Sequence, residues 1–118
     1  MAKILIVDDD INFRNGLNLR LRASGYTTAF ASDGASAVSV ARCEAPDLIL
    51  LDIGMPAGDG FVVMQRLRNL PSLASVPVIV MSGRPADNRQ RCIEAGAAAF
   101  LQKPLDNEEL VHAIARAL

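Results

Sequence analysis

The chain has 118 residues, which is the size of a single domain. Hydrophobic residues make up 51% of it and charged residues 21%, a globular composition that excludes a disordered chain. The formal net charge of −1 leaves no positive surplus for binding nucleic acid or an anionic membrane surface.

Five short apolar runs predict five strands, and several runs are continuously apolar, as strands covered on both faces are. A stretch with helix signals follows each run. This alternation requires crossover connections, so it predicts an α/β fold with a parallel sheet and helices on both faces. The runs are Lys3–Val7, Tyr26–Ala31, Leu48–Leu51, Val76–Met81 and Ala98–Leu101.

The intervening stretches carry caps and helical spacing. The first predicted helix runs from Asp10 to Ser24-Gly25, and the second from an N-cap at Asp33-Gly34 through Ala45, where Pro46 stops it. The third begins at a cap at Asp59, and the fourth runs from about Ala86 to Ala95 and is closed by Gly96. The fifth begins at a cap at Asp106 and continues to the end of the chain. Apolar residues at helical spacing mark one face of each of three helices. These residues are Phe13, Leu17 and Leu21; Val63, Met64 and Leu67, which we expect to point inward; and Leu110, Ile114 and Leu118.

The N-terminus and the cysteines suggest a cytoplasmic protein with no special redox chemistry. Only residues 1–3 precede the apolar core of the first run, which is too short for a signal peptide, and no run approaches the ~18 residues of a membrane span. Cys43 and Cys92 match no metal or redox spacing. We expect both to be reduced thiols buried on helices, and His112 to be a surface residue of the last helix.

Polar residues follow the strands at the edge where open parallel sheets carry their chemistry. Each of these residues also has an ordinary structural explanation. That explanation is strongest for Asp10, which is expected to be an N-cap. Taken together, separate loops supply carboxylates, a hydroxyl and a lysine at one edge, which favours a functional site. In strand order these residues are Asp8, Asp9 and Asp10, then Asp52, Ser82 and Lys103-Pro104.

The carboxylates predict a magnesium site. Clustered carboxylates repel one another, and a hard divalent cation relieves that repulsion. Mg²⁺ takes oxygen ligands and keeps positions open for phosphate oxygens. Asp8, Asp9 and Asp52, with the backbone carbonyl of Gly54, can supply such a site. This chemistry favours phosphoryl transfer in which an aspartate accepts the group as an acyl phosphate.

From Lys3 to its end the chain resembles the receiver domain of bacterial two-component response regulators. The resemblance rests on Ile-Leu-Ile-Val-Asp-Asp-Asp (4–10), Leu-Leu-Asp-Ile-Gly-Met-Pro-Ala-Gly-Asp-Gly (50–60), Pro-Val-Ile-Val-Met-Ser-Gly (77–83) and Ala-Gly-Ala-Ala-Ala-Phe-Leu-Gln-Lys-Pro (95–104). It implies one receiver domain over residues 1–118, with a flavodoxin-like, doubly wound sheet of five parallel strands in the order 2-1-3-4-5.

The resemblance also implies a role for each matched position. Asp52 is the expected phosphoacceptor, and it would bind Mg²⁺ together with Asp8, Asp9 and the Gly54 carbonyl. Lys103 is the expected counter-ion of the phosphoryl group. Pro104 stands where the family has a cis Lys-Pro bond.

Ser82 and Phe100 are the expected switch residues. A dianionic group on Asp52 would attract the Ser82 hydroxyl, and the space that Ser82 leaves could be filled by Phe100. The face formed by the fourth helix, the fifth strand and the fifth helix would then change shape and signal. Many receiver domains carry a tyrosine at the position of Phe100. This chain therefore has no phenol hydroxyl there that could form a hydrogen bond with a partner.

The implied partners are proteins. A sensor histidine kinase or a phosphotransfer protein would supply the phosphoryl group, and a downstream protein or effector domain would receive the signal. The domain itself is not expected to turn over an external substrate or to bind nucleic acid or membranes. A dimer formed on phosphorylation is compatible with the resemblance. The cognate kinase, the output and the lifetime of the phosphorylated form stay open.

Two alternatives stay open as well. A phosphatase of the haloacid-dehalogenase type would use Asp8 and Asp10 as its Asp-x-Asp pair, although Asn12 replaces the threonine expected there. A structural adaptor would keep the fold without phosphorylation, but it would need none of the strand-end residues. Nucleotide binding has little support, since the chain has neither a Gly-x-Gly-x-x-Gly nor a Walker loop.

Overall fold

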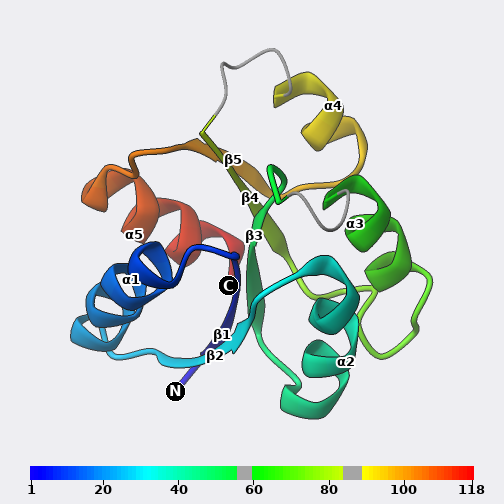
Figure 1. Ribbon diagram of the computed structural model, residues 1–118, viewed down its shortest axis with the longest axis horizontal. Helices are drawn as coiled ribbons and strands as arrows, with labels where there is room; N and C mark the ends of the chain where they lie inside the picture. Colours follow the sequence, from blue (N-terminus) through cyan, green and yellow to red (C-terminus); the bar gives the residue numbers. More distant parts are fainter. Residues whose placement is uncertain (56–59, 84–88) are drawn as a thin grey trace.

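A computed structural model describes residues 1–55, 60–83 and 89–118. Strands and helices alternate along these residues, as the sequence predicts (Figure 1). The strands are β1 (Lys3–Val7), β2 (Thr27–Ala31), β3 (Leu48–Asp52), β4 (Val78–Ser82) and β5 (Ala99–Gln102). The helices are α1 (Ile11–Ala23), α2 (Gly34–Glu44), α3 (Gly60–Arg68), α4 (Arg89–Glu94) and α5 (Asn107–Ala117).

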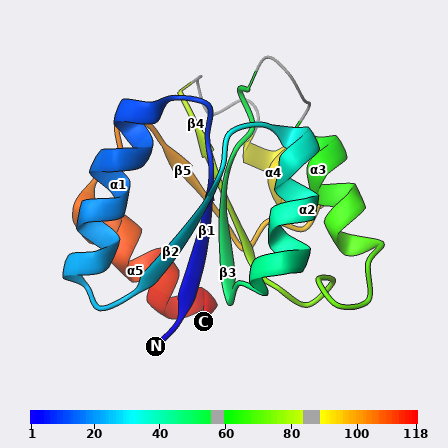
Figure 2. The same ribbon diagram turned by 60° about the horizontal axis from the view of Figure 1, so that its bottom comes forward.

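The strands form one parallel sheet in the order β2-β1-β3-β4-β5, which confirms the expected topology. Helices α1 and α5 cover one face of the sheet, and α2, α3 and α4 cover the other (Figures 1 and 2). Both faces are therefore buried, which accounts for the continuously apolar strands.

Side-chain alternation divides the interior into two hydrophobic cores. In β1, Ile4 and Ile6 pack with α1 and α5, whereas Leu5 and Val7 pack with α2, α3 and α4. The same period of two holds in β3 and β4, because successive side chains of a strand point to opposite faces. The central strands thus contribute apolar side chains to both cores.

Three helices begin at the caps that the sequence predicts. The carboxylates of Asp10, Asp33 and Asp106 accept hydrogen bonds from the N–H groups of Phe13, Ser36 and Glu109, respectively. Each bond satisfies a backbone donor that has no partner within its helix. The Asp59 cap and the start of the fourth helix at Ala86 lie outside the described residues.

Several element ends differ from the prediction by one or two residues. Tyr26 still donates its N–H to the Leu21 carbonyl at 3.0 Å, so β2 begins one residue later than expected. Helix α2 ends at Glu44 rather than Ala45, which takes a left-handed conformation with φ 48°. A residue before proline is disfavoured in the right-handed helical region, and Pro46 follows directly.

One burial prediction was wrong, and one predicted helix face is shorter than expected. Cys43 is exposed, while Cys92 is buried, because Cys43 lies two residues beyond the buried Ala41 and so falls on another face of α2. Leu118 is 49% exposed: it is spaced correctly from Ile114 but lies at the C-cap, beyond the end of α5. Among the described residues, no helix is both long and apolar enough to cross a membrane.

Candidate functional site

The strands bring the candidate site residues together through their alternation. Asp8, Asp52 and Lys103 each lie two residues beyond an apolar side chain of the core formed with α1 and α5, namely Ile6, Leu50 and Leu101. Since side chains two apart share a face, these polar groups continue that face past the end of the apolar rows. The three side chains meet through contacts with Lys103, beyond the end of β1, which leads into α1 at the upper edge of the sheet in Figure 2.

Lys103 joins the two buried carboxylates. Its Nζ lies 2.7 Å from Asp8 Oδ2 and 3.4 Å from Asp52 Oδ2. Asp8 is fully buried and Asp52 nearly so, and buried charges of this kind need a partner of opposite sign. One ammonium therefore serves two carboxylates that the sheet holds side by side.

Backbone amides bind the other oxygens of the same carboxylates. The Asp10 N–H donates to Asp8 Oδ1 at 2.9 Å, and the Gly54 N–H donates to Asp52 Oδ1 at 2.8 Å. A Cβ at position 54 would stand only 3.3 Å from Asp52 Oδ1, so glycine lets the backbone come close to this carboxylate. Both side chains are thus fixed at two points.

Burial raises the pKa of Asp52 above its ordinary value of 3.8. The Gly54 N–H and the Lys103 ammonium act in the opposite direction, and the nearby Asp8 charge adds to the rise. The dominant cause is the loss of water around the ionised group. Asp52 is therefore a poorly hydrated carboxylate beside a fixed cation.

A third carboxylate completes an acidic cluster. Asp8, Asp9 and Asp52 each offer an oxygen, and these oxygens all lie within 4.8 Å of one another. Asp9 is exposed, so the cluster opens to solvent on its side. The donors are all hard oxygens, the type that Mg²⁺ or Ca²⁺ prefers. The cluster could hold such a metal.

Asp10 is not part of this cluster. Its carboxylate accepts the Phe13 N–H at 3.1 Å as the N-cap of α1, which confirms the structural explanation given above. Of the two carboxylates in the Asp-x-Asp pair, that of Asp8 contacts Lys103, whereas that of Asp10 caps α1. This geometry counts against the Asp-x-Asp phosphatase.

Ser82 and Phe100 belong to the other side of the sheet. Phe100 pairs in register with Val80, and Ser82 lies two residues beyond Val80 on the same face. Both Ser82 and Phe100 are buried. The Lys103 N–H donates to the Ser82 carbonyl at 2.8 Å, which links the ends of β4 and β5 beside the carboxylates. The peptide bond between Lys103 and Pro104 is cis, as expected.

Sequence reasoning missed a residue that touches the site. Lys103 Nζ lies 3.9 Å from the centre of the Phe13 ring, close enough for a cation–π interaction. Helical spacing marks Phe13 only as part of one helix face. Its place in the first turn of α1, three residues after a strand-end aspartate, is the signal that could have identified it.

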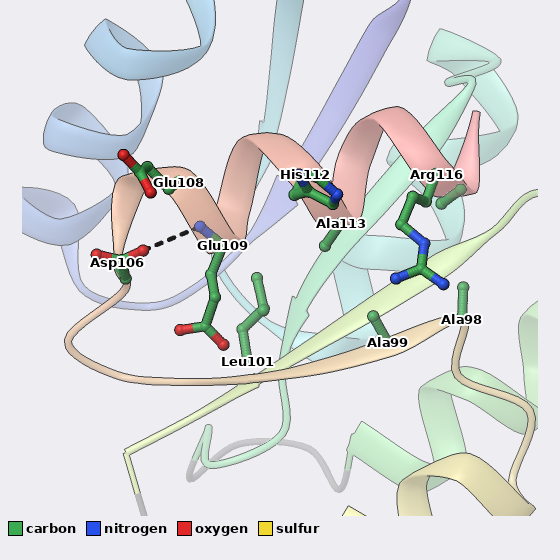
Figure 3. Close-up of a pocket in the computed structure, with 10 residues that line it drawn as sticks. Ala98, Ala99, Leu101, Asp106, Glu108, Glu109, His112, Ala113 and Arg116 are labelled. Carbon is green, nitrogen blue, oxygen red and sulfur yellow. Dashed lines mark hydrogen bonds between the residues drawn. The ribbon is translucent and has the colours of Figure 1, made fainter.

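A separate hollow of about 650 Å³ lies between β5 and α5 (Figure 3). Small residues such as Ala99 and Ala113 line it. Glu109 and Arg116 reach from α5 toward β5 at different ends of the hollow, and His112 between them is exposed, as expected. None of the residues that line this hollow belongs to the acidic cluster.

Comparisons with known proteins agree with this geometry. The family model of the response regulator receiver domain matches residues 4–115. The chain is 44% identical over 110 residues to the transcriptional regulatory protein PrrA of Mycobacterium bovis, and 39% identical over 108 residues to the response regulator PleD of Caulobacter vibrioides. These matches cover 92% and 90% of this chain but only 46% and 24% of the two relatives.

Among solved structures, the chain is similar to the chemotaxis response regulator CheY4 of Vibrio cholerae. The TM-score is 0.91 at 30% identity, and the match covers 100% of this chain and 99% of the other. The family model spans nearly the whole sequence, and the sheet order is the one that the resemblance implied. The chain belongs to the family of response regulator receiver domains of two-component systems.

Proposed function

We propose that this chain is a phosphorylation-driven switch in which Asp52 accepts a phosphoryl group from a histidine kinase or a phosphotransfer protein. The observation that carries the proposal is the bridge that Lys103 makes between Asp52 and Asp8, at 3.4 and 2.7 Å. The bridge puts the Lys103 ammonium beside one oxygen of the buried Asp52 carboxylate, while the Gly54 N–H donates to the other oxygen. Family membership supports the same role for these residues.

In the proposed transfer, an Asp52 oxygen forms a bond to phosphorus while the bond between phosphorus and the donor's imidazole nitrogen breaks. The electron pair of that bond leaves with the imidazole. Because Asp52 is nearly buried, its oxygen has little water to lose on attack. Lys103 then faces the charge of the bound phosphoryl group as a compact point charge.

Asp8, Asp9 and Asp52 would hold a Mg²⁺ ion, with the Gly54 carbonyl as a further ligand. The donor set fits, because the three carboxylates offer hard oxygens within 4.8 Å of one another and Asp9 is open to solvent. When bound, the ion would neutralise negative charge at the phosphoryl oxygens. Asp8 would keep its contact with Lys103, and so hold the ammonium in place.

The proposed output runs through Ser82 and Phe100 to the face formed by α4, β5 and α5. Ser82 lies at the end of β4, next to β5, where its hydroxyl could turn toward a new charge on Asp52. The hollow beside α5, with its small-residue lining and its flanking charges, offers a downstream protein a place to bind on this face. A dimer formed on phosphorylation would be another use of the same face.

The acceptor is tested by mass spectrometry after treatment with acetyl phosphate and Mg²⁺. We expect the wild-type protein to gain one phosphoryl group at Asp52, and Asp52→Asn to gain none. Asp10→Asn is the matched control, since it alters a neighbouring aspartate that serves as a cap and should label like the wild type. Labelling of Asp52→Asn at the wild-type rate would refute the assignment.

The cation is tested by the same reaction. Without Mg²⁺, or in Asp9→Asn, we expect labelling to slow by at least ~10-fold. The reason is that loss of one electrostatic contact to the reacting group raises the activation free energy by about 1.4 kcal/mol or more. A structural adaptor would show neither labelling nor Mg²⁺ binding that depends on Asp9. Steady hydrolysis of a phosphate ester that is lost in Asp8→Asn would instead support the phosphatase.

A further inference from the structure

Helix α4 has few apolar anchors within its described residues. Over Arg89–Glu94, only Cys92 is buried, and it belongs to the core that also contains Val80 and Phe100. Ile93, the only large apolar residue of this segment, is 45% exposed. Among the described residues of α4, apolar burial against the sheet therefore rests on Cys92 alone.

Two arginines of α4 each contact an aromatic ring of a different element. The Arg89 guanidinium carbon lies 5.5 Å from the centre of the Phe100 ring on β5. The Arg91 guanidinium carbon lies 3.8 Å from the centre of the Phe61 ring on α3. Both distances are within the range of cation–π interactions. Since the two arginines are two residues apart, they leave α4 in different directions, so the helix is held on two sides.

The Arg89 contact involves the ring of an expected switch residue. Phe100 is only 5% exposed, and Ser82 lies on the same face of the neighbouring strand. We propose that Arg89 is a positioning residue that couples α4 to Phe100, so that α4 stays docked while the ring lies under the guanidinium. Should Phe100 move toward space left by Ser82, its ring would withdraw from Arg89 and α4 would open more often. This second step rests on the proposed function.

The two cysteines allow α4 opening to be measured directly. Cys92 on α4 is fully buried, whereas Cys43 on α2 is exposed. Because Cys92 is fully buried, an alkylating reagent can reach its sulfur only when α4 opens; burial also raises the pKa of this thiol, an effect that Arg91 partly offsets. Alkylation of Cys92 by iodoacetamide, relative to Cys43 in the same molecule and read by mass spectrometry, reports the open fraction.

We expect Arg89→Ala to speed the alkylation of Cys92 roughly 2- to 5-fold, which corresponds to about 0.5–1 kcal/mol for an exposed cation–π contact. Arg89→Lys keeps a cation and should fall between Ala and the wild type. Arg116→Ala is the matched control: it removes an exposed arginine on α5 rather than on α4, and it should leave the rate of Cys92 alkylation unchanged. An Arg89→Ala rate equal to the wild-type rate would overturn the proposal.

A double-mutant cycle distinguishes this specific contact from general loosening of the helix. In a Phe100→Leu background, Arg89→Ala should have no further effect, because the ring is already absent. Phe100→Met serves the same purpose if the leucine variant does not fold. Additive effects of the two substitutions would overturn the coupling between Arg89 and Phe100.

The link to Asp52 is tested with beryllium fluoride and Mg²⁺, a mimic of a phosphoryl group on a carboxylate. We expect the mimic to speed Cys92 alkylation in the wild type, up to the same roughly 2- to 5-fold, and to have no effect in Arg89→Ala. Equal acceleration in both proteins, or none in the wild type, would overturn the link. Failure of the proposed function is distinguishable, since it appears as an Asp52 that acetyl phosphate does not label.

Discussion

Helices α4 and α5 flank the same strand, β5, but are held by different forces. Helix α5 buries Leu110 and Ile114 completely, and its first turn is capped by Asp106. The described part of α4 buries only Cys92 and makes two arginine–aromatic contacts. Apolar burial of a large side chain contributes several-fold more free energy than an exposed cation–π contact.

This difference in contacts predicts that α4 is displaced from the sheet more easily than α5. Energy gained from apolar burial is lost only when a whole side chain leaves the core. Contacts between a guanidinium and a ring can break and form again at the surface at little cost. A helix held mainly in the second way can move without unfolding the domain.

The largest expected effect tests the apolar anchor of α5. Leu110→Ala should lower the free energy of unfolding by ~2–5 kcal/mol, because it leaves a cavity in a fully packed core. The neighbouring Val111 is exposed, and Val111→Ala should stay within ~0.5 kcal/mol of the wild type. Urea unfolding followed by circular dichroism measures both variants. A loss below ~1 kcal/mol for Leu110→Ala would remove the contrast with α4.

A smaller effect tests the cap of the same helix. Asp106→Ala should lower the free energy of unfolding by about 1 kcal/mol, since the Glu109 N–H loses its acceptor. Asp106→Asn keeps an acceptor at the same position and should retain most of the wild-type stability. If both substitutions lowered the free energy of unfolding equally in urea titrations, the negative charge of Asp106, and not its hydrogen bond, would account for the stabilisation.

On α4 the corresponding substitution should have almost no effect. Ile93 is the large apolar residue of its described part, but it is 45% exposed. Ile93→Ala should therefore change the free energy of unfolding by less than ~0.5 kcal/mol. A loss above ~1 kcal/mol would reveal an apolar anchor for α4 and would weaken the distinction between the two helices.

Helix α2 extends the comparison to a cap that titrates. The Ser36 N–H lowers the pKa of Asp33 below its ordinary 3.8. A carboxyl whose pKa is lower in the folded state stabilises the fold above its unfolded pKa, and this contribution is lost as the pH falls through the folded value. The stability advantage of the wild type over Asp33→Asn should therefore be present at neutral pH and disappear in acid. Urea midpoints of both proteins, measured from neutral to acidic pH, test this prediction. A difference between the two midpoints that does not change with pH would contradict it.

Much of the fold and the site could be predicted from sequence because both depend on local periodicity. The strand ends are within two residues of the apolar runs, and Asp8, Asp9, Asp52 and Lys103 meet because parallel strands end at one edge. The strand order could not be obtained in this way, since periodicity does not say which strands are neighbours. It came from the resemblance to the family.

What the sequence did not predict depends on the surroundings of a residue. Spacing places Leu118 on the same helix face as Leu110 and Ile114 but does not say that α5 ends before it. Apolar character predicted burial for Cys43, whose position on α2 leaves it in solvent. The contact between Lys103 and Phe13 joins residues that are distant in sequence: the position of Phe13 in the first turn of α1 puts it near the strand ends, but its partner is shown only by the tertiary fold.

The division of the strand-end residues between the two cores has a consequence for variants of this protein. Asp8, Asp52 and Lys103 extend the rows that pack with α1 and α5, whereas Ser82 extends the row that packs with α4. Damage to one interior layer need not disturb the other. Under the proposed function, substitutions in the interior layer beneath α1 and α5 should reduce phosphorylation of Asp52, whereas substitutions in the layer beneath α4 should leave phosphorylation intact and weaken the response of Phe100.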